Sequence, residues 1–161
     1  DGLDGYDYLV VDTPPTKSLL TINALNAVEE LYIPVDPGFF AVLGLTQLIG
    51  VIDDVRQYLD NGDLRLGGVI LNRMLKNNCC SDIETSLRQA FGEQVLQTVI
   101  PNAVKVEESH SRFMPVTTYA AKIAASKAFH NLVQEIIERD GLRHKKDNRN
   151  GPGTAGTGDA A

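Results

Sequence analysis

The chain has 161 residues, of which 43% are hydrophobic and 22% charged, an ordinary composition for a single globular domain. Its net charge of −6 excludes a uniformly basic coat for nucleic acid, and no apolar run reaches the ~20 residues that cross a bilayer as a helix. The two cysteines, Cys79 and Cys80, are adjacent in a predicted loop, which suits neither a disulfide framework nor a CxxC metal site. These features predict a protein of the reduced cytoplasm without membrane contact.

Strand-like and helix-like segments alternate through the first half of the chain. Residues 6–12 form an apolar and aromatic run that predicts a buried strand, which the prolines after it, Pro14 and Pro15, cannot continue. Apolar residues at every third position predict a helix over residues 18–30. A second buried strand is predicted over residues 31–35, and an amphipathic helix over residues 42–59.

The second half continues the alternation. A run of Val, Ile and Leu predicts a third strand over residues 66–71. The sequence SDIE has the spacing of a capping box and predicts a helix over residues 81–91. A fourth strand is predicted over residues 95–100, and a last helix over residues 120–139 that ends at Gly141.

This alternation predicts an α/β fold with a parallel sheet flanked by helices, because the strands lack in/out alternation of polar side chains. We expect residues 1–140 to form the folded domain and residues 141–161 to be a disordered tail, first basic and then glycine-rich. The basic residues between Arg139 and Arg149 either keep this tail solvated or contact phosphate, and the sequence leaves both readings open.

Asp12 is the first residue that could carry chemistry. It stands at the carboxyl end of the predicted strand over residues 6–12, and α/β sheets hold their ligands outside this end of their strands. Because Mg²⁺ keeps most of its water, one carboxylate suffices to place it beside phosphates. From the residues alone, Asp12 could equally cap the next helix or simply end the strand.

An ordered set of motifs resembles the ParA/MinD family of P-loop ATPases. YDYLVVDTPP is similar to the Walker B strand and its switch, and LLTINALNAVEELYIPVDP to the next helix and strand of that family. Further matches follow in order: FFAVLGLTQL, LGGVILNRM, QTVIPNAVKV and PVTTYAAK. The resemblance implies a P-loop NTPase-like parallel sheet, with ATP and Mg²⁺ as cofactors.

The first motif carries the phosphate-side roles that the resemblance implies. Asp12 would be the Walker B aspartate, a catalytic residue that holds the magnesium shell through water. Thr13, Pro14 and Pro15 would form the switch that senses the γ-phosphate.

Later motifs carry the base-side roles. Asn72 looks like the asparagine that hydrogen-bonds the adenine edge, and Arg73 follows it as in the MinD branch. A strand-end asparagine could instead be a turn former. Pro101 and Asn102 would lie in the loop that packs on the adenine.

The resemblance also implies partners. In this family an ATP-bound dimer binds DNA without sequence preference or sits on a membrane, and a partner protein stimulates hydrolysis. We therefore expect a homodimer, a ParB-like activating protein and a place on the nucleoid. Lys105, Arg112 and Lys122 are the candidate DNA contacts, since phosphate neutralisation requires only Lys and Arg. Met114 replaces a common family lysine, so solvated surface charge remains an open reading.

The P-loop is missing from these residues. Its pattern GxxxxGK[ST] supplies backbone N–H groups and a lysine to the phosphates, and the chain contains no Gly-Lys dipeptide. We therefore expect the carboxyl-terminal part of an ATPase, which alone neither hydrolyses ATP nor binds it tightly. The family fold places the P-loop strand between the strands over residues 6–12 and 31–35, so its loss leaves a gap inside the sheet.

The function that these motifs predict is part of a ParA-like ATPase that partitions plasmids, chromosomes or other cargo. One alternative is a non-catalytic DNA-binding or regulatory protein that kept the sheet and lost the nucleotide chemistry. Another is a MinD-like positioning ATPase. The latter would need an amphipathic tail, and the residues after Gly141 have no apolar face.

Overall fold

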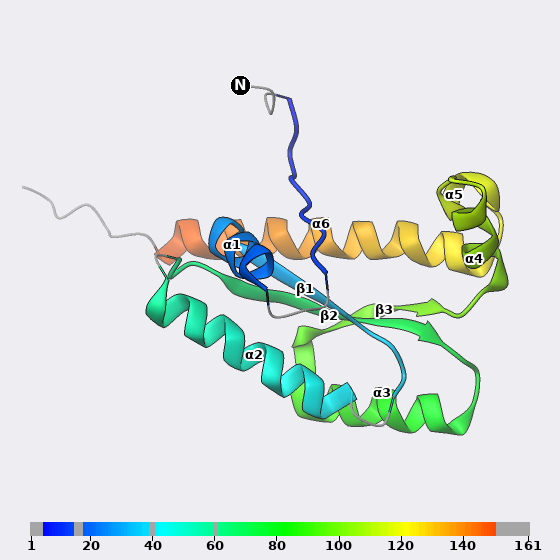
Figure 1. The fold of residues 1–161 in the computed structure, drawn as a ribbon, viewed down its shortest axis with the longest axis horizontal. Helices are drawn as coiled ribbons and strands as arrows, with labels where there is room; N and C mark the ends of the chain where they lie inside the picture. The colour runs from blue at the N-terminus through cyan, green and yellow to red at the C-terminus, as the bar shows by residue number, and fades with distance from the viewer. Residues whose placement is uncertain (1–4, 15–17, 39–40, 60, 151–161) are drawn as a thin grey trace, which may run out of the picture. The chain divides into compact units, whose positions relative to one another are not determined.

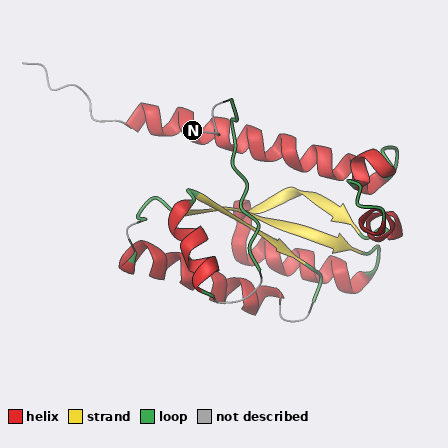
Figure 2. Cartoon of the chain, turned by 45° about the horizontal axis from the view of Figure 1, so that its top comes forward, coloured by secondary structure: helices red, strands yellow, loops and turns green. Residues whose placement is uncertain are grey.

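The computed structural model describes residues 5–14, 18–38, 41–59 and 61–150, with side chains up to residue 141. The strands form one sheet in the order β1–β2–β3, which confirms the predicted α/β class with helices flanking a parallel sheet (Figures 1 and 2). The chain divides into two compact units, Asp1–Val95 and Leu96–Ala161.

In chain order the elements are α1 (Leu19–Ala27), β1 (Glu30–Val35), α2 (Ala41–Tyr58), β2 (Arg65–Met74), α3 (Asn78–Phe91), the 3₁₀ turn η1 (Gly92–Gln94), β3 (Val95–Pro101), α4 (Val104–Ser111), α5 (Val116–Tyr119) and α6 (Ala124–Asn150).

The first unit is built on the parallel pair β1–β2. Helices α2 and α3 lie on the same side of this pair (Figures 1 and 2). The amphipathic helix predicted over residues 42–59 is α2, and its buried face meets α1 and the loop before β2 in an apolar cluster. Asn61 ties the same region together, since its Nδ2 donates at 2.8 Å to the carbonyls of Leu25 and Val28. The cluster consists of Leu25, Ile52, Val55 and Leu64.

A close approach between β1 and β2 explains one glycine of the LGGVIL run. The Tyr32 ring lies over Gly67 so closely that a Cβ at Gly67 would stand 2.6 Å from two ring carbons. The Tyr32 hydroxyl donates to Glu30 at 2.7 Å, and Arg65 donates to the same carboxylate at 2.9 Å. The ring is therefore held in place where only a residue without a side chain fits beneath it.

The strand predicted over residues 6–12 does not form. Residues 8–14 contain no strand, and Leu9 and Val10 are 69% and 89% exposed. A strand must pair its backbone with a neighbour, and no described strand lies beyond β1 at that end of the sheet. The prediction was wrong because apolar composition alone does not provide the pairing partner.

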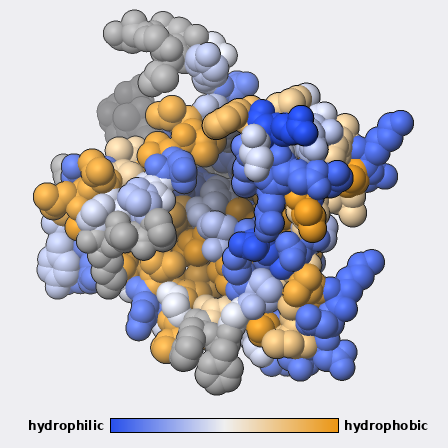
Figure 3. Space-filling view, turned by 45° about the vertical axis from the view of Figure 1, so that its right-hand side comes forward, coloured by the Kyte–Doolittle hydropathy of each residue, from blue (hydrophilic) through white to orange (hydrophobic). Residues whose placement is uncertain are grey.

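Further apolar side chains of the first unit stay on the surface. Helix α1 carries both apolar and polar residues around its circumference; within it only Leu25 is buried, and Leu19 and Leu20 are 77% and 72% exposed. Figure 3 shows hydrophobic residues, in orange, exposed at the surface among hydrophilic residues in blue.

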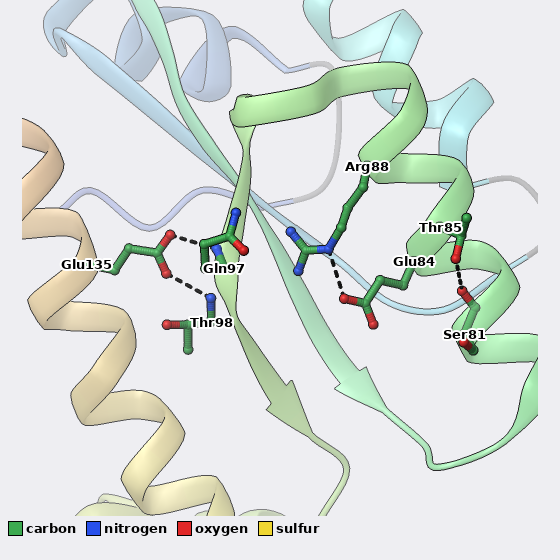
Figure 4. Close-up of polar contacts among 7 residues, drawn as sticks. All are labelled: Ser81, Glu84, Thr85, Arg88, Gln97, Thr98 and Glu135. Carbon is green, nitrogen blue, oxygen red and sulfur yellow. Dashed lines mark hydrogen bonds and ion pairs between the residues drawn. The ribbon is translucent and has the colours of Figure 1, made fainter.

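Helix α3 begins earlier than the capping-box spacing predicts. Its N-cap is Asn77, whose side chain accepts a hydrogen bond from the Cys80 backbone N–H at 2.9 Å. Asn caps a helix as well as Ser does, so the helix gains a turn that contains both cysteines, which were wrongly expected in a loop. Glu84 lies inside the helix and pairs with Arg88 at 2.9 Å (Figure 4).

In the second unit, α4 and α5 lie at the amino-terminal end of α6 (Figure 1). The sequence did not predict these helices, because α5 is only four residues long and shows no helical period. Ser126 of α6 is fully buried, and its hydroxyl donates to the carbonyls of Val116 and Ala120 at 3.1 and 2.8 Å. These bonds fix α5 on the start of α6.

Helix α6 differs from the predicted last helix at both ends. It begins at Ala124 and continues past Gly141 to Asn150. A helical glycine costs only about 1 kcal/mol relative to alanine, so Gly141 alone does not stop the helix. Two apolar residues of the helix, Val133 and Ile137, are 52% and 42% exposed. Most of the predicted tail, residues 151–161, lies outside the described residues.

The described helices include none that is both long enough and apolar enough to cross a membrane.

A carboxylate of α6 caps the backbone of β3. Glu135 accepts hydrogen bonds from the backbone N–H groups of Gln97 and Thr98 at 2.7 and 2.8 Å (Figure 4). Arg139 pairs with the same carboxylate at 3.1 Å. Partial burial acts to raise the pKa of Glu135, but these N–H groups and the Arg139 charge outweigh it and hold the pKa below its usual value.

Substitution of Gly67 tests the close approach. Gly67→Ala is expected to lower the free energy of unfolding by about 1–3 kcal/mol, because the Tyr32 ring must move. The matched control is Gly50→Ala in α2, where nothing lies within 4 Å of the added Cβ. Better helix propensity makes that change neutral or stabilising by up to about 1 kcal/mol. Urea unfolding measures both, and a Gly67→Ala penalty that persists in a Tyr32→Ala background would contradict the assignment.

Glu135→Gln tests the cap on β3. At pH 7 the amide leaves one backbone N–H facing a donor, and we expect a loss of about 2 kcal/mol in the free energy of unfolding. Because the folded-state pKa is depressed, the stabilisation is full above the unfolded-state pKa of about 4.3 and is lost as the pH falls through the folded-state pKa. The difference between Glu135→Gln and the unaltered chain should therefore shrink at pH ~3. The exposed Glu138→Gln is the control, and a difference that is independent of pH would refute the cap.

Candidate functional site

Three polar residues meet at the carboxyl ends of β1 and β2. The parallel register pairs Val35 with Leu71, so the residues that follow, Asp36 and Asn72, stand side by side. Asn72 Nδ2 donates to Asp36 Oδ1 at 3.1 Å, and Arg73 Nη1 lies 3.8 Å from Asp36 Oδ2. Polar groups at this edge of a parallel sheet occupy the usual ligand position of α/β folds.

The hydrogen bond to Asp36 orients the Asn72 side-chain amide and leaves part of its hydrogen-bonding capacity for another partner. The bond to Asp36 uses one N–H of the Asn72 amide and leaves its carbonyl oxygen and second N–H for a ligand. Asn72 lies within β2, so it is not a turn former; the left-handed residue is Arg73, with φ of 52°. The Asp36–Arg73 pair is more than half exposed, and such pairs contribute little to stability.

The sequence prediction included Asn72 and Arg73 but missed Asp36. A signal was present in IPVDP, because Asp36 follows a buried strand just as Asp12 follows an apolar run. The partner of Asn72 depends on the register of β1 against β2, which sequence spacing does not specify.

The structure does not bring the Walker B-like residues to this edge as part of a strand. Asp12 and Pro14 are exposed and Thr13 is half-buried, in a segment without secondary structure. Pro14 contributes only its carbonyl oxygen, which accepts from the Thr21 hydroxyl at 3.4 Å. Asp12 does not cap α1, because Ser18 takes that position and accepts from the Thr21 N–H at 3.3 Å. Pro15 lies outside the described residues.

The residues present fit a magnesium nucleotide only in part. In the described part of the chain, no three His, Cys, Asp or Glu side chains gather as a metal site. Mg²⁺ does not require such a cage, since one carboxylate, water and the substrate phosphates suffice. Asp12 can supply that carboxylate, but the backbone that grips the phosphates is absent from these 161 residues.

The other residues predicted to lie on the base side, Pro101 and Asn102, belong to the second unit. Pro101 ends β3, and Asn102 is exposed in the short connection to α4. The N-cap of α4 is Ala103, which has no side-chain acceptor for the first turn. The connection is therefore held by β3 and α4 rather than by contacts of Asn102.

The predicted DNA contact Lys105 has an internal partner. Its ammonium donates to Glu108 at 2.6 Å, and the Tyr119 hydroxyl donates to the same carboxylate at 3.0 Å. The Lys105 ammonium also lies 5.9 Å from the centre of the Tyr119 ring. The hydrogen bond to Glu108 and its charge raise the pKa of Lys105, while hydrogen bonds from Lys105 and Tyr119 lower the pKa of Glu108.

Arg112 and Lys122 are exposed on the same unit. Arg112 is the C-cap of α4, and Lys122 lies in the turn between α5 and α6. Within the described residues neither has an ion-pair partner within 4.0 Å, so both cations remain available to an anion. The three predicted DNA contacts thus differ, with Lys105 paired inside the chain and the other two open.

Comparison with known proteins agrees with this arrangement. The family described as an AAA domain matches residues 3–66. The chromosome partitioning protein ParA of Caulobacter vibrioides is 38% identical over 142 residues, which are 88% of this chain and 53% of that protein. The cell division ATPase MinD of Pyrococcus furiosus has a similar fold, with a TM-score of 0.67 and 22% identity over 84% of this chain and 53% of that chain.

A third likeness is to a nucleotide-bound structure. The cobyrinic acid a,c-diamide synthase of Mycobacterium smegmatis, with bound ADP and magnesium, gives a TM-score of 0.62 and 25% identity over 96% of this chain and 54% of that chain. The chain spans about half the length of the curated relatives it matches. Its motifs, its parallel sheet and these relatives agree: the chain belongs to the ParA/MinD family of P-loop ATPases.

Proposed function

We propose that this chain is the base-side and magnesium-side part of a ParA-like ATPase that partitions DNA or other cargo. The observation that carries the proposal is the 38% identity to a protein named as a chromosome partitioning ParA, over 88% of this chain. The polar cluster at the ends of β1 and β2 supports it, because it lies where α/β sheets bind ligands.

In this proposal Asn72 recognises adenine by a hydrogen bond. Its amide oxygen accepts from the exocyclic amine of the base, while Asp36 holds the amide in orientation through the 3.1 Å bond. Pro101 and Asn102 provide the loop that covers the base, and Arg73 stays beside Asp36 at the rim.

Asp12 holds Mg²⁺ through water in this proposal, and Thr13 and Pro14 sense the γ-phosphate. The P-loop comes from residues outside the 161 of this chain, together with a strand that pairs with the segment before Asp12. The exposed apolar side chains of Leu9, Val10 and Val11 support this view, since apolar side chains of this kind are suited to burial in a sheet. Bound Mg²⁺ neutralises charge on the phosphates during transfer.

The ATP-bound protein acts as a homodimer that binds DNA through phosphate contacts, and a ParB-like partner stimulates hydrolysis and release at the nucleoid. Arg112 and Lys122 support the DNA contact, because they are exposed and lack ion-pair partners among the described residues. Lys105 joins them when it exchanges Glu108 for phosphate, which costs little for an exposed pair.

Substitution of Asp12 tests the magnesium role in the complete ATPase that contains this chain and a P-loop. Asp12→Ala is expected to lower the rate of ATP turnover about 100-fold or more, because the metal loses its protein anchor. Asp7→Ala, exposed in the same segment, is the control and should leave turnover unchanged. Equal turnover in Asp12→Ala would remove the role assigned to this residue, and absence of turnover in the unaltered protein would favour a non-catalytic DNA-binding protein.

Substitution of Asn72 tests the adenine contact through base selectivity. Asn72→Ala is expected to raise the KM for ATP about tenfold and to reduce the preference for ATP over GTP, since guanine has no amine at that position. The exposed Asn78→Ala in α3 is the matched control. Steady-state kinetics with both nucleotides measure the effect, and an unchanged ATP-to-GTP ratio would exclude Asn72 from the base site.

A further inference from the structure

Helix α4 ends in a conformation that suits glycine, yet the residue there is Phe113. The Phe113 N–H donates to the His110 carbonyl at 3.0 Å, and the Met114 N–H donates to the Ser109 carbonyl at 3.1 Å. This pair of bonds is the Schellman motif, in which the residue after the C-cap adopts the left-handed conformation. Phe113 has φ of 52°, as the motif requires.

Phe113 gains nothing from this position within the chain. Its side chain is 97% exposed, so almost no apolar surface is buried in return for the strained backbone. Glycine would adopt the same φ without strain. Since the fold gives no reason for a phenylalanine at this position, its side chain is suited to a contact with another molecule.

The surroundings of Phe113 favour a polyanion. Residues 104–122 contain Lys105, Arg112 and Lys122 against Glu107 and Glu108, a formal charge of 3 − 2 = +1 in a chain of net charge −6. Arg112 directly precedes Phe113, and Met114, 41% exposed, follows it. An exposed apolar side chain directly after an exposed cation matches proteins that insert an apolar side chain at a base step and neutralise nearby phosphates.

We propose that Phe113 is a DNA-contact residue, whose ring packs as a wedge against base edges in the minor groove of duplex DNA. The proposal rests on the DNA binding of the proposed function and adds an apolar component to it. Arg112, adjacent to Phe113 in the chain, and Lys122 of the same unit neutralise nearby phosphates. Because the ring carries no charge, its contribution to affinity does not depend on salt, whereas that of the cations does.

The test is anisotropy of a fluorescent 24-bp duplex with the ATP-bound complete ATPase, at several salt concentrations. Phe113→Gly is expected to weaken binding about tenfold at every salt concentration, with an unchanged slope of log affinity against log salt. Arg112→Gln should instead reduce that slope by about one. Val133→Ala, which trims another exposed apolar side chain of the same unit, should change neither.

A stability measurement separates a contact role from a structural one. Relief of the left-handed strain should raise the thermal midpoint of Phe113→Gly by a few degrees while DNA affinity falls. Loss of stability and affinity together would assign Phe113 a structural role and overturn the proposal. So would unaltered DNA binding by Phe113→Gly with Arg112→Gln impaired, which leaves the proposed function standing.

Two further outcomes are decisive. If Phe113→Gly binds DNA normally but no longer responds to the activating partner, the ring contacts a protein and the proposal is wrong. If the unaltered ATP-bound protein does not bind the duplex at all, the DNA part of the proposed function fails and this inference fails with it.

Discussion

The register of β1 against β2 is the constraint on which the candidate site depends. It places Asp36 beside Asn72, because Val35 and Leu71 are paired, and a slip by one residue would turn every side chain to the other face. The pairing shifts by one residue between Leu31 and Tyr32, where Gly67 of β2 lies under the Tyr32 ring. The ion pair of Arg65 with Glu30 at 2.9 Å fixes the pairing before this shift, and the close approach at Gly67 lies at the shift itself.

The family assignment explains why apolar side chains before Asp12 are exposed. In a parallel sheet the magnesium-side carboxylate takes its position from the strand that carries it, and in this chain that strand is a loop. The cluster of Asp36, Asn72 and Arg73, by contrast, is formed, because both of the strands that carry it are present. The two parts of the proposed nucleotide site thus differ in what they require: this chain positions Asn72, whereas Asp12 requires a neighbouring strand that the described residues do not supply.

The sequence predicted the class of fold and also the elements whose apolar pattern directly reflects their burial. Examples are the amphipathic helix α2 and the continuous apolar run of β2. It failed where structure depends on a choice between local alternatives. Asn77 and Ser81 are both good N-caps, and α3 begins at the first of them. Gly141 is compatible with a helix end, but α6 continues through it to Asn150. It also failed for the contact of Asp36 with Asn72, which tertiary geometry sets, and for the contact of Glu108 with Lys105, which lies within a helix, α4, that the sequence did not predict.

The charges of the second unit bear on how tightly such a protein can bind DNA. Lys105 is neutralised by Glu108, so each chain offers Arg112 and Lys122 as its unpaired candidate cations among the described residues. Each released counterion contributes to affinity in proportion to the number of phosphates neutralised, so two cations give weak binding that salt easily reverses. A dimer doubles the number of contacts and gains through effective concentration. In the proposed function, nucleotide-dependent dimerisation therefore switches DNA binding on and off without any change in the contact residues themselves.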